Sequence, residues 1–191
     1  GEANFMRVVA GVLRSRKIEA VEGMETRPTA DKVKEAIFSR IGPYFQGGNM
    51  LDVYSGSGSI AIEAISRGMD FAWLNDSSAA AIKTIQRNIQ NLKLEAQTRV
   101  TQQSADEVLK TCAAAKLEFD LIYLDPPYAK QQNEVLIQKI CDLALIKEEG
   151  LILVESRKED VFNERIGDMV LEKEAFYGIT KISYYRREAV E

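Results

Sequence analysis

The residues best suited to chemistry are Asp125, Pro126, Pro127 and Tyr128, which follow an apolar run at residues 119–124. Proline fixes φ and has no N–H, so the two prolines leave carbonyl groups to face a ligand. Asp125 and the Pro126 carbonyl can both accept hydrogen bonds from an exocyclic amino group, and the Tyr128 ring can stack on a planar base. Two such acceptors favour the sp3 geometry that an aromatic amine needs before it attacks a methyl group. A rigid loop that merely ends a strand explains the prolines, but not the acid and the aromatic residue beside them.

A second feature is the glycine-containing stretch at residues 50–64, whose pattern predicts a buried strand, a tight turn and a helix. Gly56 and Gly58 allow the backbone to turn sharply and to approach a ligand, and the first N–H groups of the helix face the same point. Asp52 would repel a pyrophosphate but attracts a cation, such as a sulfonium or an amino group. The pattern therefore favours S-adenosylmethionine over a dinucleotide. The alternative interpretation is a solvated turn at the end of a core strand.

Asp76 is a third candidate for ligand contact. It follows the predicted strand at residues 71–75 and lies about 20 residues beyond the glycines, where an acidic side chain reaches ribose hydroxyls in a Rossmann-like unit. Asp76 could instead cap the helix predicted at residues 79–92. The strand-end position and the spacing favour the ligand role.

Ser104 and Ala105 follow the next predicted strand, at residues 98–102. A polar side chain and a backbone N–H at this strand end could meet the edge of an adenine. Asp106 as a cap of the following helix is the other interpretation, and the residues alone favour it slightly.

These candidates require parallel strands joined by helices, because the carboxyl ends of such strands meet at one edge of a sheet. Periodicity predicts helices at residues 32–41, 79–92 and 135–145. The predicted strands begin at residue 50 and continue at residues 71–75, 98–102, 119–124, 151–155, 169–173 and 179–186, with residues 162–166 in a short helix or loop. The last two strands have no helix between them, so we expect an antiparallel hairpin that turns at Tyr177 and Gly178. The predicted fold class is α/β, with seven strands in a mostly parallel, Rossmann-like sheet flanked by helices.

Length and composition are consistent with one folded domain. The chain has 191 residues, of which 46% are hydrophobic, and we expect a single domain at residues 6–191 because no repeat or linker divides it. Residues 1–5 precede Met6 and are interpreted as a cloning remnant. No apolar run approaches the roughly 20 residues of a membrane span. We therefore expect a soluble, cytoplasmic monomer.

Two residue types narrow the chemistry. The chain has no histidine, which excludes His-based general bases, Ser-His-Asp triads and the common zinc sites. Cys112 and Cys141 fall in predicted helices without metal-ligand spacing, so we expect packing residues, no disulfide and no metal. The chemistry must then rest on carboxylates, backbone groups and a reactive cofactor.

The N-terminal segment differs from the rest of the chain in charge. The whole chain has a net charge of −4 and a pI near 5.2, which is not typical of a nucleic-acid-binding protein. Residues 6–29, however, predict a short β-ribbon with a basic end that could bind phosphates, the alternative being a solvated charged hairpin. Its basic residues are Arg7, Arg14, Arg16, Lys17 and Arg27. Thr29 or Asp31 is expected to cap the helix at residues 32–41.

In this order, the glycine turn, the strand-end acid and the Asp-Pro-Pro-Tyr tetrapeptide resemble class I S-adenosylmethionine-dependent methyltransferases that act on exocyclic amino groups of nucleobases. Among these, the chain resembles RsmD, a bacterial family of 16S ribosomal RNA guanine-N2 methyltransferases. The resemblance extends from residue 6 to about residue 187 and rests on RVVAG at residues 7–11, RSRK at 14–17, TRPT at 26–29, DVYSGSG at 52–58, EAISRG at 63–68, DPPY at 125–128 and VES at 154–156. DPPY is shared with DNA adenine-N6 enzymes, whereas the basic hairpin and the Arg-Pro-Thr element are more specific.

The resemblance implies a role for each matching position. The implied cofactor-binding residues are Asp52, Tyr54, Ser55, Gly56, Ser57, Gly58, Asp76, Ser77, Ser104 and Ala105. Of these, Asp52 and the glycines would hold the methionine part of S-adenosylmethionine, Asp76 the ribose, and Ser104 with Ala105 the adenine. Asp125 would orient the guanine amino group, and Tyr128 would stack on the base. The family usually has Glu at Asp76, often a charged pair at Ser77 and Ser78, and Asp or Asn at Ser104.

The implied substrate is 16S ribosomal RNA in an assembling 30S subunit, bound through the basic hairpin and presenting a flipped or unpaired guanine. A DNA adenine-N6 methyltransferase is the nearest alternative, although such enzymes usually carry a separate target-recognition domain. A dinucleotide-dependent oxidoreductase would not explain Asp52, and neither cysteine stands beside a proline at a strand end as a cytosine-C5 enzyme requires. A non-catalytic RNA-binding assembly protein that retains the fold is the remaining alternative.

Overall fold

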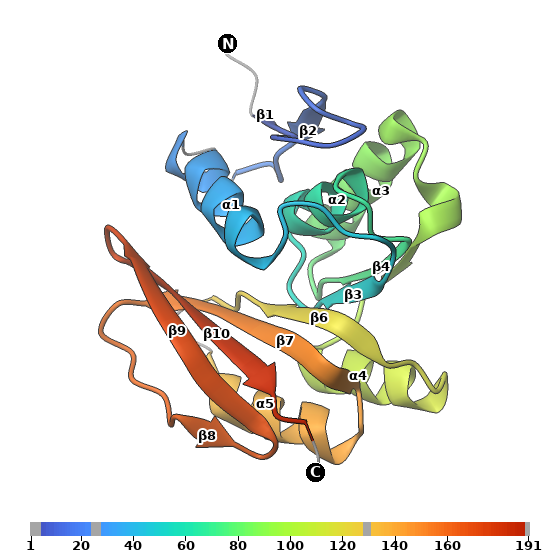
Figure 1. Ribbon diagram of the computed structural model, residues 1–191. Coiled ribbons are helices and arrows are strands. Elements are labelled where there is room, and N and C mark those ends of the chain that lie inside the picture. The colour runs from blue at the N-terminus through green and yellow to red at the C-terminus, as the bar shows by residue number, and fades with distance from the viewer. Residues whose placement is uncertain (1–4, 24–27, 128–130, 190–191) are drawn as a thin grey trace. The chain divides into compact units, whose positions relative to one another are not determined.

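The computed structural model describes residues 5–23, 28–127 and 131–189 (Figure 1). The chain forms two compact units, Gly1–Gln102 and Gln103–Glu191, which are described one at a time. Tyr128 and Arg27 lie outside the described residues.

The first unit contains three parallel strands in the order β5–β4–β3. Their bounds are Asn49–Asp52 for β3, Phe71–Asn75 for β4 and Thr98–Thr101 for β5. The helices α2 (Ser59–Ser66) and α3 (Ala79–Leu92) follow β3 and β4, and the 3-10 turn η1 (Glu95–Gln97) precedes β5. Parallel strands are covered on both faces, and Leu51, Trp73 and Leu74 are accordingly at most 1% exposed. This crossover arrangement places the ends of β3 and β4 beside the starts of α2 and α3.

A two-stranded antiparallel hairpin opens the first unit. It pairs β1 (Phe5–Arg7) with β2 (Lys17–Glu19), so that Met6 faces Ile18. Phe5, which the sequence analysis left outside the fold, belongs to β1. The predicted ribbon is therefore present, with shorter strands and a longer connection than the pattern indicated.

The helix α1 (Pro28–Ile41) follows the hairpin and begins four residues before the predicted start. Proline is favoured at the first helical position because the N–H that it lacks has no partner there. Thr29 and Asp31 therefore lie inside the first turn, and the prediction that one of them caps the helix is wrong. Asp31 instead pairs with Lys34 at 3.6 Å.

The second unit begins with α4 (Ala105–Ala114) and contains the strand order β6–β7–β10–β9–β8. The strands β6 (Phe119–Leu124) and β7 (Ile146–Arg157) are parallel, and α5 (Asn133–Asp142) connects them. β10 (Thr180–Arg187) pairs antiparallel with both β7 and β9 (Met169–Tyr177), and β9 pairs with β8 (Arg165–Ile166). The predicted antiparallel hairpin is confirmed, with Gly178 at a φ of 61° in its turn. Tyr177, which was also predicted in the turn, is instead the last residue of β9 and pairs with Thr180.

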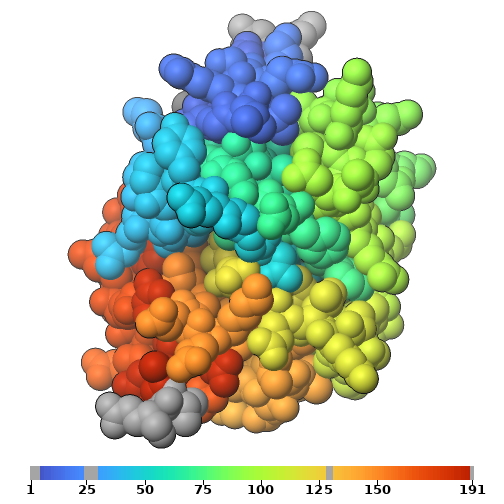
Figure 2. Space-filling view, turned by 45° about the vertical axis from the view of Figure 1, so that its right-hand side comes forward, coloured from blue at the N-terminus to red at the C-terminus, as the bar shows by residue number. Residues whose placement is uncertain are grey.

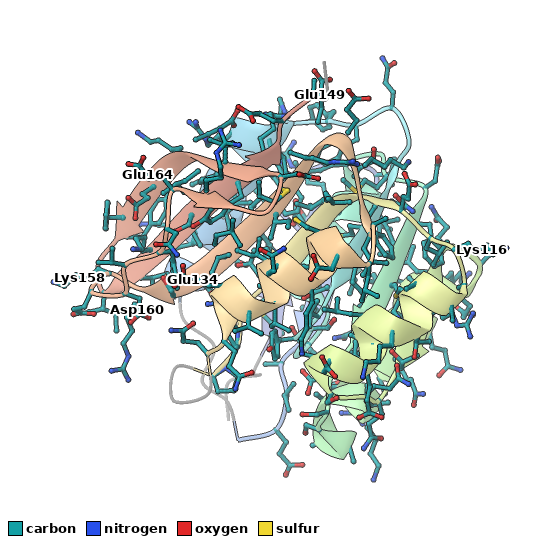
Figure 3. The ribbon with its side chains drawn as sticks, turned by 90° about the horizontal axis from the view of Figure 1, so that it is seen from below. Lys116, Glu134, Glu149, Lys158, Asp160 and Glu164 are labelled. Atoms are coloured by element: carbon teal, nitrogen blue, oxygen red, sulfur yellow. The ribbon has the colours of Figure 1, made fainter. Side chains whose placement is uncertain are left out.

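The segment between β7 and β8 crosses the start of α5. The backbone N–H of Asn163 donates to the Glu134 carboxylate at 3.1 Å, and the Tyr185 hydroxyl of β10 donates to the Asn163 carbonyl at 2.8 Å. Figure 3 shows Glu134 and Asp160 near the same end of α5. These bonds fix the segment that the sequence predicted as a short helix or loop, and its last two residues form β8 as an additional strand.

All seven predicted strands are present. β7 extends beyond the predicted residues 151–155 at both ends, because Ile146 pairs with Phe119 of β6 and Arg157 pairs with Thr180 of β10. Among the described residues, no helix is long and apolar enough to cross a membrane.

Candidate active site

Hydrogen bonds of Ser55 and Asn75 fix the glycine-containing turn between β3 and α2. The Ser55 hydroxyl donates to the Asp52 carbonyl at 2.9 Å and accepts from the Asn75 N–H at 3.1 Å, while the Asn75 carboxamide donates to the Val53 carbonyl at 3.1 Å. Ser55 and Asn75 are buried, at 8% and 1% exposed. Buried hydrogen bonds of this kind fix the turn before any ligand binds.

Gly58 and Gly56 serve different purposes in this turn. Gly58 has a φ of 88° at the start of α2, and a Cβ atom there would lie 3.0 Å from the Leu74 side chain. Gly56 has a φ of 57°, and no atom lies within 4 Å of where its Cβ would be. The missing Cβ of Gly58 therefore lets the turn pack against Leu74 of β4. At Gly56, the missing Cβ leaves space beside the backbone that a ligand can occupy.

Asp76 joins this turn to the start of α3. One carboxylate oxygen accepts from the Gly56 N–H at 2.9 Å, and the other accepts from the Ser78 N–H at 2.9 Å. Asp76 does not cap α3, because the N-cap is Ser78, whose hydroxyl accepts from the Ala81 N–H. Each Asp76 oxygen has a further lone pair, so the half-exposed carboxylate can still accept a ligand hydroxyl.

Exposure separates the other predicted cofactor residues of the first unit into two groups. Asp52 and Ser57 are buried, at 1% and 8% exposed. Tyr54 is half-buried and Ser77 is exposed. Burial raises the pKa of the Tyr54 hydroxyl above its ordinary value, so this group stays protonated at neutral pH. Tyr54, Gly56, Asp76 and Ser77 thus present the reachable surface.

In the second unit, Ser104 is the N-cap of α4. Its hydroxyl accepts from the Glu107 N–H at 3.1 Å, and the Glu107 carboxylate accepts from the Ser104 N–H at 3.2 Å, which completes a capping box. The interpretation of Asp106 as the cap is wrong. Asp106 instead forms ion pairs with Lys139 and Lys110, and hydrogen bonds from these two side chains lower its pKa.

Ala105 is the first residue of α4, and the first N–H groups of a helix have no partner within the helix. Because both the hydroxyl and the N–H of Ser104 are used in the capping box, Ala105 is the better donor for a ligand at this helix start.

The predicted catalytic residues follow β6 directly. Asp125 is half-exposed, Pro126 is buried and Pro127 is exposed, while Tyr128 lies outside the described residues. The β6 residues Ile122 and Leu124 are fully buried. A rigid core strand therefore ends at a carboxylate that a ligand can reach.

The basic residues of the N-terminal hairpin are on its surface, which Figure 2 shows in dark blue. Arg7, Arg14, Arg16 and Lys17 are exposed. The cationic groups of Arg7 and Lys17 lie 5.1 and 4.7 Å from the centre of the Phe5 ring, and Arg16 donates to the Asn91 carbonyl of α3 at 3.3 Å. Arg27 was also predicted to bind RNA and is not among the described residues.

Sequence reasoning missed the buried ionic cluster that holds this hairpin. The Glu63 carboxylate accepts from the Val9 and Ala10 N–H groups at 2.9 and 3.0 Å and from Arg67 at 2.8 Å, and it lies 3.3 Å from the Lys34 ammonium. Burial lowers the pKa of Lys34, against the opposing effect of the two nearby carboxylates. Glu63 was a signal, because it is the one charged residue of α2 and its neighbours along the helix, Ile62 and Ala64, are apolar.

Within residues 5–23, 28–127 and 131–189, no group of three or more His, Cys, Asp or Glu side chains could hold a metal ion. Cys112 is buried, and the thiol of Cys141 is half-buried with its pKa raised by burial.

The chain is similar to several known proteins. The family model described as "Conserved hypothetical protein 95" matches residues 6–186. A Bacillus subtilis protein named "Putative rRNA methyltransferase YlbH" is 39% identical over 182 residues, which are 95% of this chain and 99% of that protein. A Haemophilus influenzae protein named "Ribosomal RNA small subunit methyltransferase D" is 33% identical over 155 residues, covering 81% and 80% of the two chains.

A solved structure extends the similarity to three dimensions. The Escherichia coli structure described as "Putative methyltransferase yhhF" superimposes with a TM-score of 0.82 at 29% identity, covering 97% of this chain and 99% of the other.

Proposed function

Because this chain belongs to the RsmD family of ribosomal RNA methyltransferases, we propose that it transfers a methyl group from S-adenosylmethionine to the exocyclic N2 of a guanine in 16S rRNA. The fold is that of S-adenosylmethionine-dependent methyltransferases, and the protein is an rRNA methyltransferase that uses this cofactor. The choice of guanine N2 is our proposal, and it rests on Asp125 and the two prolines at the end of β6.

The residues of the first unit fit this cofactor. The open space above Gly56 admits a ligand against the backbone, and the Asp76 carboxylate keeps two lone pairs for ribose hydroxyls. We assign the methionine part to Asp52, Tyr54 and the glycine turn of this unit. The resemblance to the family assigns the adenine to Ser104 and Ala105, which belong to the second unit. When bound, the cofactor supplies a methyl group on a positively charged sulfur, and Asp52 adds a negative charge that favours such a cation.

The chain's own residues would act on the amine. Asp125 and the Pro126 carbonyl accept hydrogen bonds from the two N2 protons, which orients the nitrogen lone pair and favours its sp3 geometry. One N2 proton then leaves along its hydrogen bond to Asp125 as the nitrogen gains the methyl group. Tyr128 is proposed to stack on the base. No residue is needed as a nucleophile, because the amine itself takes the methyl group, and orientation of the two reactants supplies much of the rate.

The basic hairpin is the proposed RNA contact. Arg7, Arg14, Arg16 and Lys17 present their charges to solvent, and Arg27 belongs to the same proposed set. Such contacts with phosphates give affinity without sequence preference. We infer that the protein acts as a monomer in the cytoplasm on an assembling small subunit, and that residues 6–191 work as one methyltransferase domain.

Methyl transfer to ribosomal subunits tests the proposal. The protein is incubated with radiolabelled S-adenosylmethionine and small subunits that lack the modification, and the rRNA is digested to nucleosides and analysed by mass spectrometry. We expect N2-methylguanosine as the product. Methylated adenine, or no transfer to RNA, would contradict the proposal.

Asp125→Asn tests the assigned residue. The amide keeps the size of the side chain and one acceptor oxygen. It cannot take the N2 proton as a carboxylate does, so methyl transfer should fall by at least the 100-fold that proton transfer typically contributes. Binding of S-adenosylhomocysteine, measured by calorimetry, should change little. Asp120→Asn on the same strand is the matched control, because Asp120 forms a surface ion pair with Lys147 at 3.1 Å. Equal rates for the two variants would remove Asp125 from the mechanism.

A further inference from the structure

Both strands of the basic hairpin are joined to the cofactor turn by buried side chains of the first unit. Asn88 of α3 connects β2 to Ser57, and Lys34 of α1 connects β1 to Ser59. Ser57 and Ser59 are the two neighbours of Gly58, so the connections reach the turn on both sides of its glycine.

Asn88 makes three hydrogen bonds with its carboxamide. The oxygen accepts from the Glu19 N–H at 2.9 Å, and the nitrogen donates to the Glu19 carbonyl and to the Ser57 carbonyl, both at 2.9 Å. The side chain is 2% exposed. A planar amide with both N–H groups engaged cannot follow a shift of Glu19 without moving the hydrogen that binds Ser57.

Lys34 forms the parallel connection. Its ammonium donates to the Arg7 carbonyl at 2.8 Å and to the Ser59 hydroxyl at 2.9 Å, and it is 2% exposed. Since Ser59 is the first residue of α2, this bond fixes the helix start that follows the turn. Water cannot replace these bonds at buried positions, so a displaced hairpin must either pull the turn with it or leave polar groups unpaired.

The Ser57 carbonyl accepts the hydrogen bond from Asn88, and the next residue, Gly58, has a φ of 88°. The peptide between Ser57 and Gly58 is therefore held at both of its polar atoms: Asn88 donates to the Ser57 carbonyl, and the Gly58 N–H donates to the Ser55 carbonyl at 2.8 Å. A cofactor bound against this turn contacts its backbone, so a change in the orientation of this peptide changes the affinity for the cofactor.

We propose that Asn88 is a positioning residue that couples the two ligands of the protein, so that RNA bound to the basic hairpin and cofactor bound at the glycine turn strengthen each other's binding. The inference rests on the proposed function for its RNA ligand, and it adds that the hairpin regulates the cofactor site as well as holding the substrate.

Binding measurements of the full chain test the coupling without any reaction. The affinity for S-adenosylhomocysteine is measured by calorimetry in the absence and in the presence of saturating unmodified small subunits. The ratio of the two affinities is the coupling factor, and the cofactor product must change the subunit affinity by the same factor. We expect a factor of about fivefold or more, at the lower end of the usual range for coupled sites.

Asn88→Asp is the informative variant. It keeps the shape and the acceptor for the Glu19 N–H, but it removes both donors and places a second carboxylate oxygen against the Ser57 carbonyl. We expect the coupling factor to fall toward one, while each ligand alone still binds within a few-fold of its original affinity. A merely structural role would lower the thermal stability and leave the ratio unchanged.

Two variants on the same helix are the controls. Arg87→Gln breaks the ion pair with Glu19 at 3.0 Å and loosens the hairpin without touching Ser57. Asn91→Ala changes an exposed asparagine. Both should keep the coupling factor. The proposal is overturned if Asn88→Asp keeps the original factor, if Arg87→Gln loses as much as Asn88→Asp, or if the unaltered protein shows no coupling. Absence of any subunit binding would instead refute the proposed function.

Discussion

Glu63→Gln is the substitution with the largest effect on stability that we expect. Glu63 is fully buried, and its two oxygens together receive the Val9 and Ala10 N–H groups and the cations of Arg67 and Lys34. Glutamine has the same size, but one of its two terminal atoms is an N–H2 group. In either orientation of the amide, the N–H2 group faces one backbone N–H and one cation. All three groups are hydrogen-bond donors, so no hydrogen bond can form between them.

The expected loss follows from those contacts. Removing one partner of a buried, hydrogen-bonded ion pair typically costs about 3 to 5 kcal/mol, because the remaining charges stay buried without compensation. For a chain of this length, each kcal/mol lowers the melting temperature by about 2 to 4 °C. Glu63→Gln should therefore lower it by at least about 6 °C.

Urea unfolding followed by circular dichroism measures this loss as a lower midpoint with an unchanged m-value. Glu35→Gln is the matched control, because Glu35 is an exposed residue of α1 and undergoes the same change of charge. Its effect should stay within about 0.5 kcal/mol. A loss below about 1 kcal/mol for Glu63→Gln would refute the reasoning, since it would mean that the cluster contributes little to the attachment of the hairpin.

Three further predictions concern the cofactor turn and the hairpin. Gly58→Ala places a side chain at a φ of 88°, so it should cost about 1 to 2 kcal/mol and weaken S-adenosylhomocysteine binding; unchanged calorimetry would contradict this. Reversing Arg14, Arg16 and Lys17 to Glu should reduce the slope of log affinity against log salt for RNA by about 2, at roughly 0.7 per phosphate contact. An unchanged slope would leave the hairpin as a solvated element. Because burial raises the Tyr54 pKa, the stability from this group is present below about pH 10 and is lost as the pH rises through the raised pKa. Tyr54→Phe should therefore show a smaller fall in urea midpoint between pH 9 and pH 11, and an equal fall would contradict the assignment.

Most elements of the fold could be predicted from local patterns. The strand Phe71–Asn75, the helix Ala79–Leu92 and the strand Phe119–Leu124 have the predicted bounds. Each is a long apolar or amphipathic run with polar residues on both sides, so periodicity alone identifies it. The bounds of α1 and β7 differ, because a proline at the first helical position and pairing with a neighbouring strand extended them.

The sequence by itself determined which chemistry the chain can perform. The Asp-Pro-Pro-Tyr tetrapeptide, the glycine turn and the absence of histidine exclude most other catalytic strategies, because they depend on residue type and local spacing. They also carried the resemblance that the comparisons confirmed at the level of the family.

Only the tertiary structure decided which polar residues hold the site and which remain available to a ligand. The Ser55 hydroxyl binds within the glycine turn, and the Ser104 hydroxyl caps α4. Asp76 accepts from the N–H groups of Gly56 and Ser78, and its oxygens keep lone pairs for a ligand. Asn88 connects the hairpin to the turn because the fold places Glu19 and Ser57 within hydrogen-bond distance of its carboxamide. The physical reason is that a buried hydrogen bond depends on distance in space, and residues far apart in the chain give no local pattern that would reveal it.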